Sequence, residues 1–196
     1  LELSLEKQTG NYMIFFPSYE MLSAVYEIAR DSNLALVSEL VVQEPFMEEK
    51  SREDFLEKFR RKAGKPLIGF CVLGSIFSEG IDLTGESLIG VVIVGTGLPQ
   101  ICNEREVIRE YFDRRQKKGY DYAYRYPGMN KVLQAAGRVI RTAQDTGTIL
   151  LMDERFLERE NQKLFPEEWD SYYGVNRQNY GKVLKDFWEE RRRRES

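Results

Sequence analysis

The amino-acid sequence predicts an α/β domain built on a mainly parallel β-sheet with helices on both faces. Two observations lead to this fold class. The strand candidates, such as residues 12–16, are apolar along their whole length, which is typical of strands buried on both faces. They also alternate along the chain with amphipathic helix candidates. No internal repeat or low-complexity linker interrupts this order, so we expect a single domain.

The first half of the chain supplies three strands and two helices. Residues 12–16 form the first strand candidate, which Pro17 closes, and Ser18 is a good N-cap for the helix that follows. The apolar stripe of that helix consists of Met21, Leu22, Val25, Ile28 and Ala29. The next elements are expected at residues 36–42 (strand), 47–62 (helix, ending at Gly64) and 67–73 (strand).

The second half continues the alternation. A fourth strand is expected at residues 88–94, and a highly charged helix at 103–118. An aromatic-rich stretch leads into a helix at 129–142 and a fifth strand at 148–152. Polar helices follow to the end.

Composition narrows the class of protein. The 196 residues are 42% hydrophobic and 31% charged, as in soluble globular proteins, and the net charge of −3 does not indicate a nucleic-acid binder by itself. The sequence has no histidine, which excludes histidine-based catalysis and makes a metal site unexpected. Cys71 and Cys102 lack metal-ligand spacing and predict reduced, buried thiols.

No apolar run is long enough for a membrane span and no signal peptide is evident, so we expect a cytoplasmic protein without a membrane partner. Because the chain begins with Leu1 instead of Met, we expect a fragment of a longer protein.

Residues 132–141 are the most informative stretch. On a helix, Gln134, Arg138 and Arg141 would share one narrow arc with Gly137 at its edge, and almost all other positions are apolar. Two arginine forks and an amide held together suit a phosphate or a carboxylate. The alternative is a basic, solvated face of an amphipathic helix.

A second candidate site follows the strand at 67–73. At the carboxyl end of a parallel strand, where open α/β sheets bind ligands, residues 74–82 contain two glycines, two serines and an aspartate. Ser75 and Ser78 could donate to phosphates, and Asp82 could accept from a sugar hydroxyl. The alternative is an ordinary connection in which Asp82 caps the next element.

Three segments together resemble helicase motifs IV, V and VI, in order and with suitable spacing. They are Phe15-Phe16-Pro17-Ser18-Tyr19, Phe77-Ser78-Glu79-Gly80-Ile81-Asp82 and Gln134-Ala135-Ala136-Gly137-Arg138-Val139-Ile140-Arg141. The likeness is to the second RecA-like motor domain of DinG/XPD-type superfamily 2 helicases. It implies a RecA-like three-layer sandwich over residues 1–170, with 171–196 as a helical tail. It also implies that the N-terminal, ATP-binding motor domain is absent from this chain.

The resemblance assigns roles at an ATP site between the two motor domains. It implies that Arg138 and Arg141 contact the γ-phosphate as arginine fingers and that Gln134 positions that phosphate or the attacking water. Glu79, Gly80, Asp82 and Gly137 would line the nucleotide edge. ATP and Mg²⁺ would be held mainly by the absent domain, which could also carry an iron–sulfur cluster. The sequence itself contains no phosphate-loop motif, so the fragment alone is expected to be inactive.

The resemblance also implies single-stranded DNA as a partner, with translocation from 5′ to 3′. Ser18, at a helix N-terminus, would meet a nucleic-acid phosphate, Ser75 and Ser78 would do likewise, and Tyr19 would also contact the nucleic acid. Tyr126 belongs to an alternating series with Tyr120, Tyr122 and Tyr124. These rings could stack on bases or pack an irregular loop against the sheet.

Three functional hypotheses follow. The first is an enzyme, the C-terminal motor half of an ATP-dependent DNA helicase, a hydrolase of acid anhydrides. The second is a RecA-like module that binds nucleic acid or protein without catalysis. The third is a phosphate-binding regulatory domain with a Mg²⁺ site at Asp153 and Glu154. The stretch 148–154 resembles a Walker B strand, but no phosphate loop precedes it, so we interpret Asp153 and Arg155 as structural. We interpret the run Arg191 to Arg194 as a solvated helix end.

Overall fold

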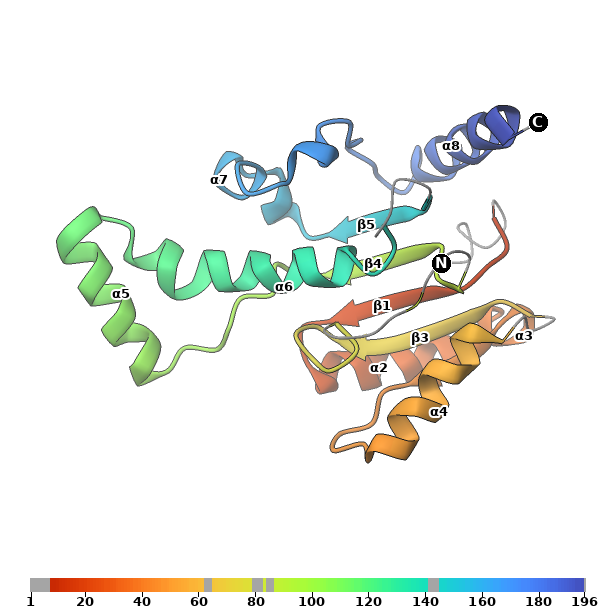
Figure 1. The fold of residues 1–196 in the computed structure, drawn as a ribbon, viewed down its shortest axis with the longest axis horizontal. Coiled ribbons are helices and arrows are strands. Elements are labelled where there is room, and N and C mark those ends of the chain that lie inside the picture. Colours follow the sequence, from red (N-terminus) through yellow and green to blue (C-terminus); the bar gives the residue numbers. More distant parts are fainter. Residues whose placement is uncertain (1–7, 62–64, 79–82, 84–86, 141–144, 196) are drawn as a thin grey trace.

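A computed structural model describes residues 8–61, 65–78, 83, 87–140 and 145–195 (Figure 1). Its centre is a five-stranded, entirely parallel sheet in the order β2-β3-β1-β4-β5. The strands are β1 (Tyr12–Phe16), β2 (Glu39–Val42), β3 (Leu67–Val72), β4 (Gly90–Val94) and β5 (Thr148–Met152). The expected α/β class with a parallel sheet is confirmed.

Strand β1 lies at the centre of the sheet. In the register of the parallel strands, Phe15 pairs with Cys71 on β3 and with Ile93 on β4. Because every strand points the same way, the segments that follow them meet at one edge. We call this the carboxyl edge. The chain reaches it at Pro17 after β1 and at Gly95 after β4.

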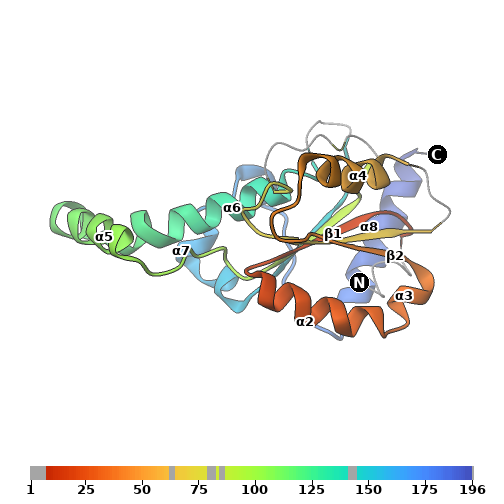
Figure 2. The ribbon, with the colours of Figure 1, turned by 90° about the horizontal axis from the view of Figure 1, so that it is seen from below.

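Helices cover both faces of the sheet, which makes three layers (Figure 2). One face carries α2 (Tyr19–Arg30) and α3 (Leu34–Val37), and the other carries α4 (Glu49–Arg60) and α6 (Tyr126–Ala136). The remaining helices are α5 (Asn103–Gln116), α7 (Arg159–Gln162) and α8 (Tyr180–Glu195), with 3₁₀ turns at Glu154–Leu157 and Glu167–Trp169 and a π-helical turn at Asp121–Arg125. The expected helices on both faces are confirmed.

Each face has its own hydrophobic core. Alternate side chains of β1 point to opposite faces, so Phe15 joins Phe59 of α4 and Val132 of α6 in one core. Phe16 joins Leu22 of α2 in the other. This burial on both faces explains why the strands are apolar throughout.

Two expectations about the first half are wrong. Leu36 and Val37 belong to the helical turn α3, not to the second strand, and they are 71% and 52% exposed. The turn places Leu34 in the core, and the Ser38 hydroxyl donates a 2.6 Å hydrogen bond to its carbonyl oxygen. Met21 and Ile28, both expected on the apolar stripe of α2, are 43% and 72% exposed, since Leu22 and Ala29 are the residues of that helix that the sheet buries.

The helix α5 projects beyond the carboxyl edge and is joined to α6 by the π-helical turn (Figure 1). None of its residues is buried. It ends at Lys117, whose φ of 56° lies in the left-handed region, and Gly119 follows where a Cβ would lie 2.1 Å from the Arg109 carbonyl oxygen. The chain therefore reverses tightly between α5 and the segment that carries the tyrosines.

The C-terminal helix α8 packs at the opposite, amino edge of the sheet. Trp188 is 2% exposed and lies against Tyr12 and Ile89, which flank the starts of β1 and β4. Arg191 donates a 3.2 Å hydrogen bond to the carbonyl oxygen of Thr146, just before β5. The first arginine of the terminal run therefore contacts the domain, whereas Arg194 pairs with Glu190 on α8 itself.

No helix in the described part of the chain is long and apolar enough to cross a membrane.

Candidate functional site

Arg138 connects the two candidate segments. Its Nε and Nη2 atoms donate hydrogen bonds of 3.1 and 3.0 Å to the carbonyl oxygen of Ser78, in the loop that follows β3. The side chain is half-buried. The loop after β3 and the arginine segment are therefore in direct contact.

We expected Gln134, Arg138 and Arg141 to lie on one arc of a helix, but Arg138 lies beyond the end of that helix. The helix α6 ends at Ala136, and the chain tightens so that the Arg138 and Val139 amides bond to carbonyls only three residues earlier. Val139 is 3% exposed and joins the core, which explains why the regular helix stops there. Gln134 stays on the exposed face of α6.

Gly137 caps α6 and is exposed. Its conformation (φ −64°, ψ 0°) is open to any residue, so the backbone itself does not require a glycine. Arg141, Glu79, Gly80 and Asp82 lie outside the described residues.

The loop after β3 is held by its own serines. Gly74 has a φ of +76° and turns the chain next to the side chain of Lys131 on α6. The Ser78 hydroxyl, fully buried, donates a 2.7 Å hydrogen bond to the Ser75 carbonyl oxygen, and the Ser75 hydroxyl donates at 2.9 Å to Gln43 Oε1. Both hydroxyl protons are therefore engaged within the protein, and these serines shape the loop in this conformation.

Ser18 and Tyr19 lie at the carboxyl edge. The Ser18 hydroxyl caps α2 by accepting a 3.3 Å hydrogen bond from the Met21 amide, as expected, and the side chain is exposed. Tyr19 is half-buried, and its hydroxyl oxygen accepts a 2.8 Å hydrogen bond from Gln43 Nε2. Beside them is an open cavity of about 350 Å³, lined by residues that include Pro17, Met21, Gly95, Thr96, Asp153 and Arg155.

Sequence reasoning missed Gln43. It follows β2 directly, is 3% exposed, and contacts Tyr19 and Ser75, two of the expected nucleic-acid residues. A polar side chain placed immediately after an apolar strand, at the edge where ligands bind, was the available signal.

Asp153 and Arg155 form a local ion pair, in line with the structural interpretation. Asp153 Oδ1 accepts from Arg155 Nε at 2.8 Å and Oδ2 accepts from Nη2 at 2.6 Å. These hydrogen bonds hold the pKa of Asp153 below its ordinary value. Because Arg155 engages both carboxylate oxygens, the geometry does not favour a Mg²⁺ site here. Within the described ranges, no group of three or more acidic or cysteine side chains is arranged to hold a metal ion.

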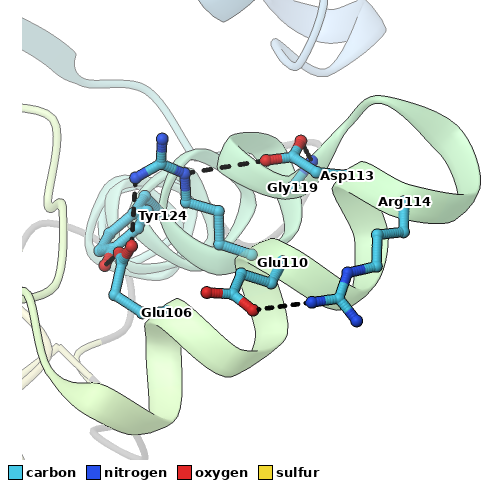
Figure 3. Close-up of polar contacts among 7 residues, drawn as sticks. Glu106, Glu110, Asp113, Arg114, Gly119 and Tyr124 are labelled. Carbon is cyan, nitrogen blue, oxygen red and sulfur yellow. Dashed lines mark hydrogen bonds and ion pairs between the residues drawn. The ribbon is translucent and has the colours of Figure 1, made fainter.

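The tyrosines pack mainly against α5, not against the sheet. The Tyr122 ring stacks on Phe112 with centroids 3.9 Å apart, and Tyr126 meets Tyr122 edge-on at 5.2 Å. The Tyr124 hydroxyl donates to Glu106 at 2.5 Å, within the polar cluster of α5 that Figure 3 shows. That hydrogen bond raises the pKa of Tyr124. Tyr126 remains half-buried and Tyr120 is 45% exposed.

The two cysteines, both expected to be buried, lie in different environments. Cys71 is fully buried in the centre of β3, as expected, but Cys102 is exposed in front of α5, so that expectation is wrong. Neither forms a disulfide.

Known proteins are similar to this chain in sequence and in fold. Residues 1–172 match the family model described as "Helicase C-terminal domain". The chain is 28% identical over 164 residues to a probable ATP-dependent helicase of Methanocaldococcus jannaschii, covering 78% of this chain and 24% of the relative. It is 29% identical over 208 residues to the human regulator of telomere elongation helicase 1, covering 93% and 17%. The chain thus spans a quarter or less of the length of these relatives.

Solved structures agree on the fold. An XPD helicase structure superposes with a TM-score of 0.62 at 22% identity, covering 82% of this chain and 28% of that one. The C-terminal domain of the DEAD-box protein Dbp5 superposes with a TM-score of 0.52 at 15% identity, covering 94% and 87%. The RecA-like three-layer fold is therefore confirmed, and the chain belongs to the helicase C-terminal domain family.

Proposed function

We propose that this chain is the second motor domain of an ATP-dependent DNA helicase. In this proposal residues 1–170 form the motor domain and 171–196 a helical tail. The domain completes an ATP site whose other wall is an N-terminal motor domain, and it grips single-stranded DNA. The observation that carries the proposal is the double hydrogen bond from Arg138 to the Ser78 carbonyl oxygen, which joins the two segments that we propose to face the nucleotide.

The chemistry of phosphoryl transfer fits such an arginine. Charge that develops on the γ-phosphoryl oxygens needs a cation held in place, and an arginine finger contributes about 10³–10⁵ in rate. An arginine guanidinium is planar and carries a fixed positive charge, and the Ser78 carbonyl restrains the plane of this group in Arg138. In the proposed site Arg138 and Arg141 contact the γ-phosphate, Gln134 orients it or the attacking water, and Glu79, Gly80, Asp82 and Gly137 line the nucleotide.

The other wall must supply what this sequence lacks. Since the chain contains no phosphate-loop motif, ATP and Mg²⁺ would be held mainly by the N-terminal motor domain, where an iron–sulfur cluster could also reside. We therefore expect this chain alone not to hydrolyse ATP. The probable ATP-dependent helicase and the human regulator of telomere elongation helicase 1 match this chain over only 24% and 17% of their length, which leaves room for such a domain.

Single-stranded DNA is proposed to lie along the carboxyl edge. Ser18 presents its hydroxyl at the N-terminus of α2, where the helix dipole favours a phosphate, and Tyr19 lies next to it. Tyr126 could contact a base at the root of α5. Ser75 and Ser78 would act indirectly, by shaping the loop. The 5′ to 3′ direction is proposed from the family.

The test uses the full-length protein and its DNA-stimulated ATPase. Arg138→Ala is expected to lower the ATPase rate by about 10³-fold or more while single-stranded DNA affinity is retained. The matched control is Arg114→Ala, because Arg114 lies on α5 and its side chain is 80% exposed. Normal turnover in the Arg138 variant would refute the arginine-finger assignment.

The same measurement separates the alternative, a RecA-like module that binds nucleic acid or protein without catalysis. If the full-length wild-type protein binds DNA but shows no ATPase, the alternative holds.

A further inference from the structure

Gln43 joins the carboxyl ends of three neighbouring strands. It follows β2, and its backbone amide extends the ladder by donating to the Phe70 carbonyl oxygen of β3 at 2.8 Å. Its side-chain oxygen Oε1 accepts from the Val72 amide and from the Ser75 hydroxyl, both at 2.9 Å. Its Nε2 donates to the Tyr19 hydroxyl oxygen, which belongs to the segment after β1. A side chain that is 3% exposed thus has partners for both ends of its amide.

The partners determine which way the amide points. The Val72 backbone N–H can only donate, so the atom facing it must be the oxygen of Gln43. The nitrogen is therefore the atom that faces Tyr19, and it too can only donate.

This arrangement assigns different roles to the two hydroxyl groups. The Tyr19 oxygen must accept from Gln43, so the Tyr19 proton points elsewhere and is available for an outside acceptor. The Ser75 proton is directed to Gln43 instead, so Ser75 offers lone pairs, one of which meets the Phe77 amide at 3.4 Å. Gln43 thus leaves the Tyr19 hydroxyl as a hydrogen-bond donor to an outside group, whereas the Ser75 hydroxyl, which donates to Gln43, is not such a donor.

An outside acceptor next to Tyr19 would meet further donors. The Ser18 hydroxyl accepts from the Met21 amide and keeps its own proton to donate, at the N-terminus of a twelve-residue helix. Phosphate oxygens accept hydrogen bonds and do not donate at neutral pH, so adjacent donors match a phosphodiester backbone.

We propose that Gln43 is a positioning residue that holds the Tyr19 hydroxyl as a hydrogen-bond donor to the phosphate backbone of a single-stranded nucleic acid. The inference rests on the proposed function and deepens it, since it assigns the contact at this part of the edge to a phosphate. Gln43 acts through Tyr19 and does not touch the nucleic acid.

The substitution Gln43→Glu tests this orientation with little change in shape. A carboxylate keeps the acceptor for Val72 and Ser75 but presents a second acceptor to Tyr19, whose proton would then turn inward. We expect the affinity of the full-length protein for a fluorescent oligothymidylate to fall about tenfold, because a hydrogen bond to a charged group is lost. Tyr19→Phe should cause a similar loss, and the double variant should be no weaker than the single ones by more than about twofold. Ser23→Ala, an exposed serine one turn further along α2, is the control.

Steady-state kinetics distinguishes positioning from a general structural effect. In Gln43→Glu, the DNA concentration that half-saturates the ATPase should rise about tenfold, while the rate at saturating DNA stays within about twofold. Additive losses in the double variant, or unchanged affinity in either single variant, would overturn the role of Gln43. Tyr19→Phe keeps the proposal falsifiable even if Gln43→Glu does not fold.

Ser18→Ala separates this inference from the proposed function. If Ser18→Ala weakens binding but Tyr19→Phe does not, the contact at the start of α2 stands and the role of Gln43 is refuted. If neither variant weakens binding, both the inference and the proposed nucleic-acid edge fail there.

Discussion

Arg138 and Ser78 are sixty positions apart in the sequence, yet two guanidinium nitrogens of Arg138 lie 3.0 and 3.1 Å from the Ser78 carbonyl oxygen. The contact ties the turn after α6 to the loop after β3. A conformational change in either segment would therefore be transmitted to the other. This coupling suits a domain that we propose to respond to a nucleotide.

Arg138→Lys tests whether the fork itself matters. Lysine keeps the positive charge but cannot present two fixed donors to one carbonyl, so we expect the DNA-stimulated ATPase rate of the full-length protein to fall about tenfold or more. Arg114→Lys on the exposed face of α5 should leave it unchanged. Wild-type turnover in the Arg138 variant would show that charge alone suffices.

Gly128→Ala should destabilise the protein although Gly128 is helical. A Cβ at this position of α6 would lie 2.7 Å from the Thr96 carbonyl oxygen and 3.1 Å from the backbone of Gly97, and backbone atoms cannot yield as a flexible side chain does. We expect the free energy of unfolding to fall by about 1–3 kcal/mol, measured by urea unfolding. Gly174→Ala is the control, since no heavy atom of the described residues, apart from its chain neighbours, lies within 4 Å of its Cβ position. Equal stability of the two variants would contradict the close packing.

Trp188→Ala should loosen the C-terminal helix from the amino edge. Trp188 is 2% exposed against Tyr12 and Ile89, so its truncation should lower the free energy of unfolding by about 3–5 kcal/mol. Faster tryptic cleavage within residues 191–194 should accompany the loss.

Two control variants sharpen the test of this anchor. The Trp188 indole N–H has no hydrogen-bond partner among the described residues, so Trp188→Phe keeps much of the packing and should cost far less. Phe187→Ala removes a neighbouring ring that is 37% exposed and should also cost less. A loss in Phe187→Ala as large as in Trp188→Ala would argue against a specific anchor.

Thiol labelling should distinguish the two cysteines. Cys102 is exposed, whereas Cys71 is fully buried, and burial raises the pKa of the Cys71 thiol far above its usual range. At pH 8 we expect a thiol reagent to modify Cys102 rapidly and Cys71 only after unfolding. Cys102→Ser should abolish the fast reaction and Cys71→Ala should preserve it. Fast labelling that persists without Cys102 would contradict the buried position of Cys71.

The sequence by itself determined the fold class and the position of most elements. Strands that are apolar throughout, such as Tyr12–Phe16, have to be buried on both faces, and Ser18 marks the start of α2 because its side chain satisfies a helix amide. These signals are local, so they can be recognised without knowledge of the rest of the chain. The motif likeness likewise depended on short segments in order.

Tertiary structure alone decided which polar groups meet. The helical period continued through Arg138 in the sequence, but burial of Val139 ended α6 at Ala136 and sent Arg138 to Ser78. Leu36 was placed on a strand by its apolar neighbours, although the core selected Leu34 instead. Gln43 gained its importance only when parallel strands brought three chain segments to one edge. Such contacts join residues far apart in sequence, and their energies depend on packing that no local pattern contains.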